Sequence, residues 1–199
     1  MRSLNIGFDF DGVITNPVKV KTKWAREKFG ISLRPEQTDK QSMIHLFGEK
    51  NYNEFKSLYY SGSLALEVDI RPKAIKAISL FNSFGHNVFI VTSRLDDEYE
   101  KAKELLNFHQ IKHKQAVNTS GESKEKYCQD LELDFLLDYT LEKLEKISKE
   151  VKTEKIWFNP YFKKNPSKIK DVKSWSEFGE IIARKEEMMI CNFLNNKKM

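Results

Sequence analysis

Two aspartates one residue apart, in Asp9-Phe10-Asp11-Gly12, are the side chains of this sequence best suited to chemistry. They follow the apolar stretch Leu4–Phe8, which is typical of a short buried strand, and Gly12 allows a sharp turn after it. Side chains alternate along a strand, so the two carboxylates would converge on one point. Such like charges repel unless a cation or proton lies between them, which favours a hard divalent metal. An ordinary Asp-Gly turn is the alternative.

The composition is that of a globular protein with one substantial core. The chain has 199 residues, of which 40% are hydrophobic and 32% charged, and no apolar run approaches the roughly 20 residues that cross a bilayer. This length allows one domain and a small inserted subdomain. We expect no membrane segment. Because Met1-Arg2-Ser3 leads directly into the first strand and leaves no room for a signal peptide, we expect a cytoplasmic protein.

Cysteine usage and charge give weaker information. Cys128 and Cys191 fit no metal-site spacing, which is typical of a protein from a reducing compartment. Lys and Arg (34) exceed Asp and Glu (29), most densely between Lys143 and Lys173, and this excess could steer anionic substrates toward the protein. Since no nucleic-acid motif accompanies the lysines, we interpret them as a solvated surface and expect no nucleic-acid partner.

The segment after the first strand favours a small helical insertion. The spacing predicts a helix over Pro17–Phe29. From Arg34 to Gly62, aromatic and apolar residues crowd into short helical stretches that are broken at Gly48 and at Gly62. We therefore predict a helical cap over residues 16–69, between the first strand and the next regular element.

Strands and helices then alternate along the chain. Apolar runs predict four further strands, over residues 87–91, 115–117, 134–138 and 155–158. Helical spacing predicts five further helices, over residues 72–84, 96–108, 123–131, 140–149 and 174–184. The alternation indicates an α/β fold with a central parallel sheet and helices on both faces. We assign the core to residues 1–15 and 70–185, and a C-terminal tail, expected to fray after Cys191, to residues 186–199.

Polar side chains follow three of the predicted strands. Asp9 and Asp11 end the first, Thr92 and Ser93 end the second, and Asp138 ends a later one. In open parallel sheets, ligands bind outside the carboxyl ends of the strands. If these strands are neighbours, all five side chains point into one crevice.

The order of these residues resembles that of the haloacid-dehalogenase-like (HAD) superfamily of phosphotransferases. The similar pattern is an Asp-x-Asp-Gly motif after the first strand, a Thr ending the second, a Lys opening a later helix and an acid ending the fourth strand. Lys124 and Lys126 could both fill the lysine position. We choose Lys124 because its distance to Asp138 resembles the family's usual run from lysine to acid.

The rest of the chain looks like the branch that holds 5'(3')-deoxyribonucleotidases and related bacterial nucleotidases. The similar features are a Trp-containing helix after the first motif, the helical cap, and the segments 85–94, 158–161 and 174–177. The resemblance covers residues 4 to about 183. It implies a HAD-like Rossmannoid three-layer sandwich, with the cap inserted after the first strand.

The resemblance also implies residue roles. Asp9 would be the nucleophile that forms an aspartyl-phosphate, and Asp11 would protonate the leaving group and then deprotonate water. Mg²⁺ would be held by Asp9, the main-chain carbonyl of Asp11, and Asp138. Three further side chains would contact the phosphate: Thr92, Ser93 and Lys124.

Each of these roles has a structural alternative. Thr92 or Ser93 could cap the following helix, Lys124 could be a solvated first-turn lysine, and Asp138 could be the N-cap of the next helix. The sequence also departs from the family at the fourth motif. Many members carry a second acid directly after the first, whereas Tyr139 follows Asp138 here and Glu142 comes four positions on. Metal affinity depends on such supporting groups.

The predicted cap would select the substrate. Four of its aromatic side chains could stack on a nucleobase or form the core of the cap: Trp24, Phe47, Tyr59 and Tyr60. Arg94 could meet a phosphate or a base edge, or lie on the surface. The leading hypothesis is a Mg²⁺-dependent phosphatase for a small phosphorylated substrate, a 5'-nucleotidase for (deoxy)nucleoside monophosphates. The alternatives are a phosphatase for another small phosphoester or a nucleic-acid end, and a catalytically silent protein that binds a phosphorylated ligand. The oligomeric state is not predicted.

Overall fold

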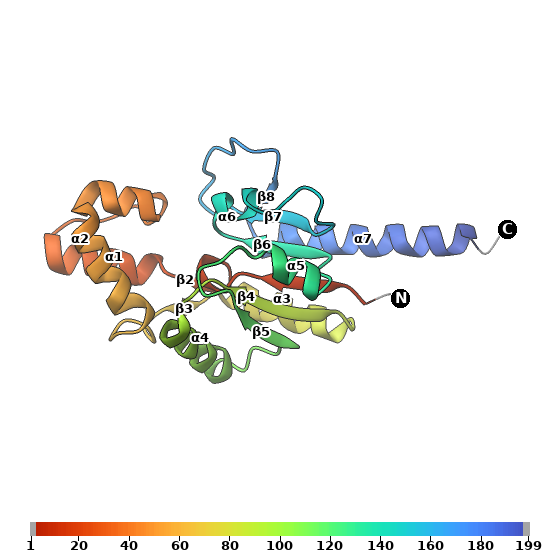
Figure 1. Ribbon diagram of the computed structural model, residues 1–199, viewed down its shortest axis with the longest axis horizontal. Helices are drawn as coiled ribbons and strands as arrows, with labels where there is room; N and C mark the ends of the chain where they lie inside the picture. Colours follow the sequence, from red (N-terminus) through yellow and green to blue (C-terminus); the bar gives the residue numbers. More distant parts are fainter. Residues whose placement is uncertain (1–2, 197–199) are drawn as a thin grey trace.

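A six-stranded parallel sheet lies at the centre of the computed structural model, which describes residues 3–196, with side chains up to residue 188 (Figure 1). The strand order is β5-β4-β1-β6-β7-β8. The strands are β1 (Asn5–Phe8), β4 (Asn87–Thr92), β5 (Gln115–Asn118), β6 (Phe135–Asp138), β7 (Glu154–Phe158) and β8 (Lys170–Val172). The central position of β1 places Asp9 between the ends of β4 and β6.

Helices cover both faces of the sheet, so the predicted α/β fold with three layers is confirmed. They are α3 (Pro72–Ser83), α4 (Asp96–Phe108), α5 (Glu125–Asp130), α6 (Leu141–Glu145) and α7 (Trp175–Asn196). Alternate residues of β4 enter different cores: Val88 and Ile90 pack with α3, α4 and α7, whereas Phe89 and Val91 pack with α5 and α6. A strand buried on both faces explains why this stretch is apolar throughout.

The residues of the predicted cap form a helical unit beside the sheet (Figure 1). Two short strands, β2 (Thr15–Asn16) and β3 (Asp69–Ile70), pair antiparallel where the chain enters and leaves it. Between them lie α1 (Val18–Phe29), the short 3-10 helix η2 (Pro35–Gln37) and α2 (Lys40–Tyr60). The backbone of Gly48 has φ 79°, which interrupts the helical geometry of α2 at a position that favours glycine.

Some element boundaries differ from the predictions. The helix expected to reach residue 149 ends at Glu145, because Glu125 accepts a hydrogen bond from the amide of Ser148 and Lys155 donates to the carbonyls of Ile147 and Ser148. Strands β2, β3 and β8 were not predicted, because two or three residues are too few to show an alternation of apolar and polar side chains.

The prediction of a separate C-terminal tail over residues 186–199 was wrong for most of its length. Helix α7 continues to Asn196, since residues 185–196 contain neither Pro nor Gly to end it. Residues 197–199 lie outside the described part of the chain. None of the helices within residues 3–196 combines the length and apolar character needed to cross a bilayer.

Candidate active site

Asp9 lies where the chain leaves β1 and turns toward the cap. Its amide donates a hydrogen bond to the carbonyl of Leu137 on β6 (2.9 Å), which fixes the backbone at the end of the sheet. The chain then forms one widened helical turn, η1 (Phe10–Ile14), in which Gly12 has φ 85°. The Tyr139 ring lies 2.5 Å from the position a Cβ at Gly12 would occupy. Glycine is therefore required there both by its backbone conformation and by its neighbour.

Lys124 joins two buried carboxylates at the end of the sheet. Its Nζ donates to Asp9 Oδ1 and to Asp138 Oδ2, each at 2.7 Å. All three residues are at most 3% exposed. Burial alone would lower the pKa of Lys124, but the two carboxylates outweigh it and raise that pKa above its ordinary value. The structure thus brings Lys124 to the acids, whereas Lys126 is exposed.

Asp138 contacts the charged cluster and also the backbone just before α6, although the N-cap residue of that helix is Thr140 and not Asp138. Its Oδ2 accepts the hydrogen bond from Lys124, and its Oδ1 accepts one from the amide of Thr140 (2.8 Å), at the start of α6. The helix-start contact and the contact to the charged cluster therefore coexist.

Asp9 is the carboxylate whose ionisation this environment opposes. Burial and the nearby charge of Asp138 raise its pKa to about 6, against the opposing effects of Lys124 and Lys143. At neutral pH it is mostly ionised, as a nucleophile must be. Its Oδ1 is held by Lys124, whereas its Oδ2 accepts no hydrogen bond from the described residues.

The raised pKa of Asp9 predicts that Asp9→Asn stabilises the metal-free protein in a pH-dependent way. Well below pH 3.8 the carboxyl is protonated in both states, so the variant and the wild type should have similar free energies of unfolding. Between the ordinary pKa of 3.8 and the folded pKa of about 6, the folded wild type keeps a proton that the unfolded chain has lost. Its stability relative to the variant therefore falls as pH rises, to a deficit of about 2–3 kcal/mol above pH 6.

Urea unfolding of both proteins in a chelator, from pH 4 to pH 7.5, measures this difference. A gap that stays constant over the whole range would show that Asp9 has an ordinary pKa in the folded state. The pair is compared at each pH, so the titration of groups that do not interact with Asp9 cancels.

Asp11 forms a different ion pair, with Arg94. The Nε and Nη2 atoms of Arg94 donate to the two carboxylate oxygens of Asp11, both at 2.9 Å, and the Tyr59 hydroxyl donates to Oδ1 at 3.2 Å. The Arg94 guanidinium lies 4.9 Å from the Phe10 ring centroid and is 2% exposed as a residue. Burial raises the pKa of Asp11, but Arg94 and Tyr59 lower it by more, so Asp11 is held ionised.

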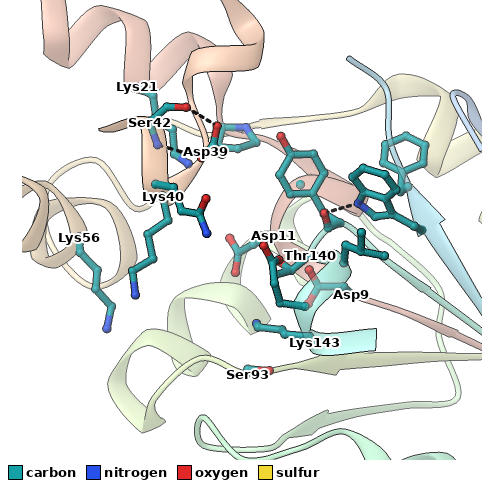
Figure 2. A pocket seen from close by; sticks show the side chains of 18 of the residues that line it. Asp9, Asp11, Lys21, Asp39, Lys40, Ser42, Lys56, Ser93, Thr140 and Lys143 are labelled. Carbon is teal, nitrogen blue, oxygen red and sulfur yellow. Dashed lines mark hydrogen bonds between the residues drawn. The ribbon is translucent and has the colours of Figure 1, made fainter. Parts of the chain in front are cut away.

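A cleft of about 930 Å³ opens between the cap and the carboxyl ends of the strands, and Asp9 and Asp11 lie on its wall (Figure 2). Eight basic and five acidic side chains line it, so the cleft favours anions even though it contains the two aspartates. Lys143 on α6 lies beside these aspartates (Figure 2), and its charge lowers the pKa of both. Within the described residues, the Lys143 side chain has no hydrogen-bond or ion-pair partner.

The predicted phosphate ligands occupy two different layers. Ser93 lines the cleft, and its hydroxyl oxygen is buried with no hydrogen-bond partner among the described residues. Thr92 and Lys124 do not line the cleft. The Thr92 hydroxyl accepts from the amide of Arg94 (3.4 Å), which is a local turn contact and not a cap of α4, whose N-cap residue is Leu95.

Of the two roles considered for Trp24 and Phe47, base stacking or the core of the cap, the structure shows the second, because both rings lie in the interior of the cap. Both are 7% exposed, and the two rings meet edge to face at 5.5 Å. Phe29 and Phe55 complete this cluster. Burial of large rings is what holds a small helical unit together.

Tyr59, Tyr60 and Arg94, the other residues considered for substrate binding, do line the cleft, but they contact one another and Asp11. Tyr59 is 2% exposed and its hydroxyl is used by Asp11. Tyr60 lines the cleft and lies 5.1 Å from the Arg94 guanidinium. Arg94 itself is neither a surface arginine nor free for a ligand in this arrangement, since Asp11 accepts from its Nε and Nη2 and the Glu98 carbonyl accepts from its Nη1.

Lys21 and Lys143 line the cleft, but neither was predicted as a site residue. Lys143 comes one helical turn after the Asp138 motif, a spacing that could have drawn attention to it. Tyr139 takes the place of a second acid and fills the space above Gly12 instead. Glu142 lines the cleft but is exposed.

The residues present fit a hard divalent cation. Asp9 and Asp138 offer carboxylate oxygens from two adjacent strand ends, and the backbone carbonyl of Asp11 is a third oxygen of the kind that Mg²⁺ accepts. A bound cation would stabilise the ionised Asp9 carboxylate and so oppose the burial and the Asp138 charge that raise the pKa of Asp9. Within residues 3–188, no three acidic, His or Cys side chains gather at one point, so the carbonyl and water would complete the site.

Neither a family model nor a curated protein matches the sequence significantly. Solved structures do match the fold. A protein described as a predicted phosphatase from Clostridium acetobutylicum has 16% identity and a TM-score of 0.63, with 92% of this chain and 100% of that chain covered. A HAD family hydrolase from Deinococcus radiodurans, with bound phosphate and sodium, has 10% identity and a TM-score of 0.61 over 92% and 96%.

A third structure, a HAD hydrolase from Bacillus subtilis bound to magnesium, has 15% identity and a TM-score of 0.54 over 91% of this chain and 99% of that chain. At these identities the likeness concerns the fold. The chain therefore has the α/β fold of the HAD-superfamily hydrolases.

Proposed function

We propose that this protein is a phosphomonoester hydrolase in which Asp9 attacks phosphorus and forms an aspartyl-phosphate. The observation that carries the proposal is the environment of Asp9. It ends the central strand of the sheet, faces an electropositive cleft, and has one oxygen fixed by Lys124 while the other accepts no hydrogen bond among the described residues. A held carboxylate and a cationic surrounding are what attack on a doubly charged phosphate ester needs.

The residues on the cleft wall would hold the phosphoryl group. The Lys143 side chain lies beside Asp9 without a partner of its own among the described residues, and the Ser93 hydroxyl is buried with none. We assign the phosphoryl oxygens to these two side chains. Lys124, which both carboxylates already engage, acts as their fixed counter-ion.

The reaction then has two steps on this chain's own residues. Asp9 bonds to phosphorus as the bond to the leaving oxygen breaks, and the leaving oxygen takes a proton from Asp11. Water next attacks phosphorus, Asp11 takes its proton, and Asp9 and inorganic phosphate are released. Asp11 can donate a proton only after Arg94 leaves it, and a substrate phosphate oxygen is the competing anion that would draw Arg94 away.

Mg²⁺ is the proposed cofactor. Asp9, the Asp11 carbonyl and Asp138 would hold it, and when bound it neutralises phosphoryl charge as the reaction proceeds. Two of the compared structures are described with phosphate or magnesium bound, which supports the same chemistry here.

The proposed substrates are (deoxy)nucleoside monophosphates, which would make the protein a 5'-nucleotidase. Besides Tyr60 from the cap, two partly buried aromatic side chains of the core line the cleft, Tyr139 and Tyr161. Aromatic rings stack on nucleobases at a gain of about 1–3 kcal/mol per base. The sugar and base stay unassigned within this class.

A catalytically silent protein that binds a phosphorylated ligand is the second candidate. The observation that favours it is the Asp11–Arg94 pair, which keeps the proton donor ionised. A protein locked in this arrangement would bind phosphate at the cleft without releasing a leaving group.

Metal-dependent hydrolysis separates the two candidates. With Mg²⁺, the protein should release p-nitrophenol from p-nitrophenyl phosphate, and a chelator should lower the rate by at least about 100-fold, with recovery on adding Mg²⁺ back. A panel of nucleoside monophosphates and sugar phosphates then tests the substrate class. Equal rates on all of them would remove the case for a nucleotidase, and no turnover of any compound would favour the silent protein.

A further inference from the structure

Lys21 on α1 places a positive charge on the cap side of the cleft. Figure 2 shows Lys21 together with Lys40 and Lys56, all from the cap helices, across from Asp9 and Asp11. Lys21 is half-buried, whereas Lys40 is exposed. An ammonium withdrawn from water needs compensation from its surroundings, so the partners of Lys21 are informative.

The compensation available to Lys21 is incomplete. Its Nζ donates to the backbone carbonyl of Thr38 at 2.7 Å, and among the described side chains no carboxylate lies within ion-pair distance of it. Asp39 is near enough to act on its charge, but the Asp39 carboxylate already accepts from Ser42 and from Lys163. At least two of the three ammonium donors of Lys21 are therefore open to a ligand.

Electrostatics point the same way. Burial lowers the pKa of Lys21 to about 8, although Asp11 and Asp39 act to raise it and only Lys163 adds to the lowering. An anion bound at Lys21 would replace the missing countercharge. Without a bound anion, the charge of the half-buried Lys21 ammonium is only partly compensated.

The size of the cleft leaves room for such an anion. A volume of about 930 Å³ is in the range that holds a whole small molecule, well beyond one phosphoryl group. The phosphate at Asp9 would be met by Lys143 and Ser93 on the core side. Lys21 faces the part of the substrate that lies toward the cap.

We propose that Lys21 binds a second anionic group of the substrate, a phosphate or a carboxylate, while the reacting phosphate lies at Asp9. This inference rests on the proposed function, because it takes Asp9 as the position of the reacting phosphate. It predicts a preference for small organic phosphates that carry a second anionic group. Among nucleotides, a nucleoside bisphosphate would then be a better substrate than the nucleoside monophosphates proposed above.

Two matched pairs of compounds test the second anion. 3-Phosphoglycerate differs from glycerol 3-phosphate by a carboxylate, and a nucleoside 3',5'-bisphosphate differs from its 5'-monophosphate by a phosphate. In the wild type, kcat/KM should be about 10- to 100-fold higher for the doubly anionic member of at least one pair. This ratio corresponds to the free energy of one charge-assisted hydrogen bond. The pair that responds identifies the anion.

Lys21→Met keeps the apolar stem and removes the charge, so it should bring this ratio close to one. Lys23→Met on the same helix removes an exposed lysine that pairs with Glu67 and does not line the cleft, and it should leave the ratio unchanged. A wild-type ratio near one in both pairs, or a ratio that survives Lys21→Met, would overturn the inference.

Binding to the Asp9→Asn protein, measured by calorimetry with the same four compounds, gives the test without turnover. A Lys21-dependent preference for the doubly anionic compounds, alongside a wild type that hydrolyses nothing, would sustain this inference and overturn the proposed function. Hydrolysis of all four compounds with no Lys21-dependent preference would sustain the proposed function and overturn this inference.

Discussion

Asp9→Asn is expected to lower the hydrolysis of p-nitrophenyl phosphate by about 10⁴-fold or more. The introduced amide has no negative charge and cannot attack phosphorus, so the loss is that of a covalent step rather than of binding. Its carbonyl oxygen can still accept a hydrogen bond from Lys124, whose Nζ lies 2.7 Å from Asp9 Oδ1 in the wild type, so the fold should persist. The measurement is kcat with saturating substrate and Mg²⁺, together with the far-ultraviolet circular dichroism of the variant.

Asp97→Asn is the matched control for Asp9→Asn. Asp97 is an exposed carboxylate on α4 that does not line the cleft, so its removal should leave kcat within about two-fold of the wild type. If Asp9→Asn retains a tenth or more of the wild-type kcat, Asp9 is not the nucleophile.

Lys124→Met is expected to impair both stability and turnover. It leaves the buried carboxylates of Asp9 and Asp138 without the cation that bonds each at 2.7 Å. Removing one partner of a buried charge pair costs about 3–5 kcal/mol, because the remaining charges keep their desolvation penalty. The pKa of Asp9 should rise further and reduce its ionised fraction at neutral pH, so kcat should fall by at least about 10²-fold.

Urea unfolding and kcat of Lys124→Met are to be compared with those of Lys126→Met. The two lysines lie two positions apart, but Lys126 is exposed, and its replacement should change the free energy of unfolding by less than about 0.5 kcal/mol. Equal effects of the two substitutions would mean that Lys124 does not stabilise the carboxylate pair. If Lys124→Met fails to fold, Lys124→Arg, which keeps a positive charge, should restore folding.

The sequence was sufficient to predict five of the six strands of the sheet and the place of the carboxylates. Apolar runs such as 87–91 identify strands covered on both faces, and Asp9 and Asp138 stand where two of those strands end. Because parallel neighbours end at one edge, the meeting of the two acids follows from topology. The choice of Lys124 over Lys126 as the lysine that reaches them depended on family-like spacing.

Contacts that depend on the packing of distant segments could not be predicted in this way. Arg94 and Asp11 are 83 positions apart, and nothing local shows that the guanidinium turns to the aspartate rather than to a ligand. Trp24 and Phe47 have the same helical spacing whether their rings face the cap interior or the cleft, and burial decided for the interior. In the sequence, nothing distinguishes Lys21 from the other lysines of a lysine-rich chain.

The most direct test of the account is to trap the phosphorylated protein. Wild type mixed with p-nitrophenyl phosphate and Mg²⁺ is quenched in acid within the first turnovers, and its peptides are analysed by mass spectrometry. We expect one added phosphoryl group (HPO₃) on the peptide that contains Asp9, located on Asp9 by fragment ions, and none in Asp9→Asn. Release of p-nitrophenol without any phosphorylated peptide, or with the phosphoryl group on another residue, would contradict it.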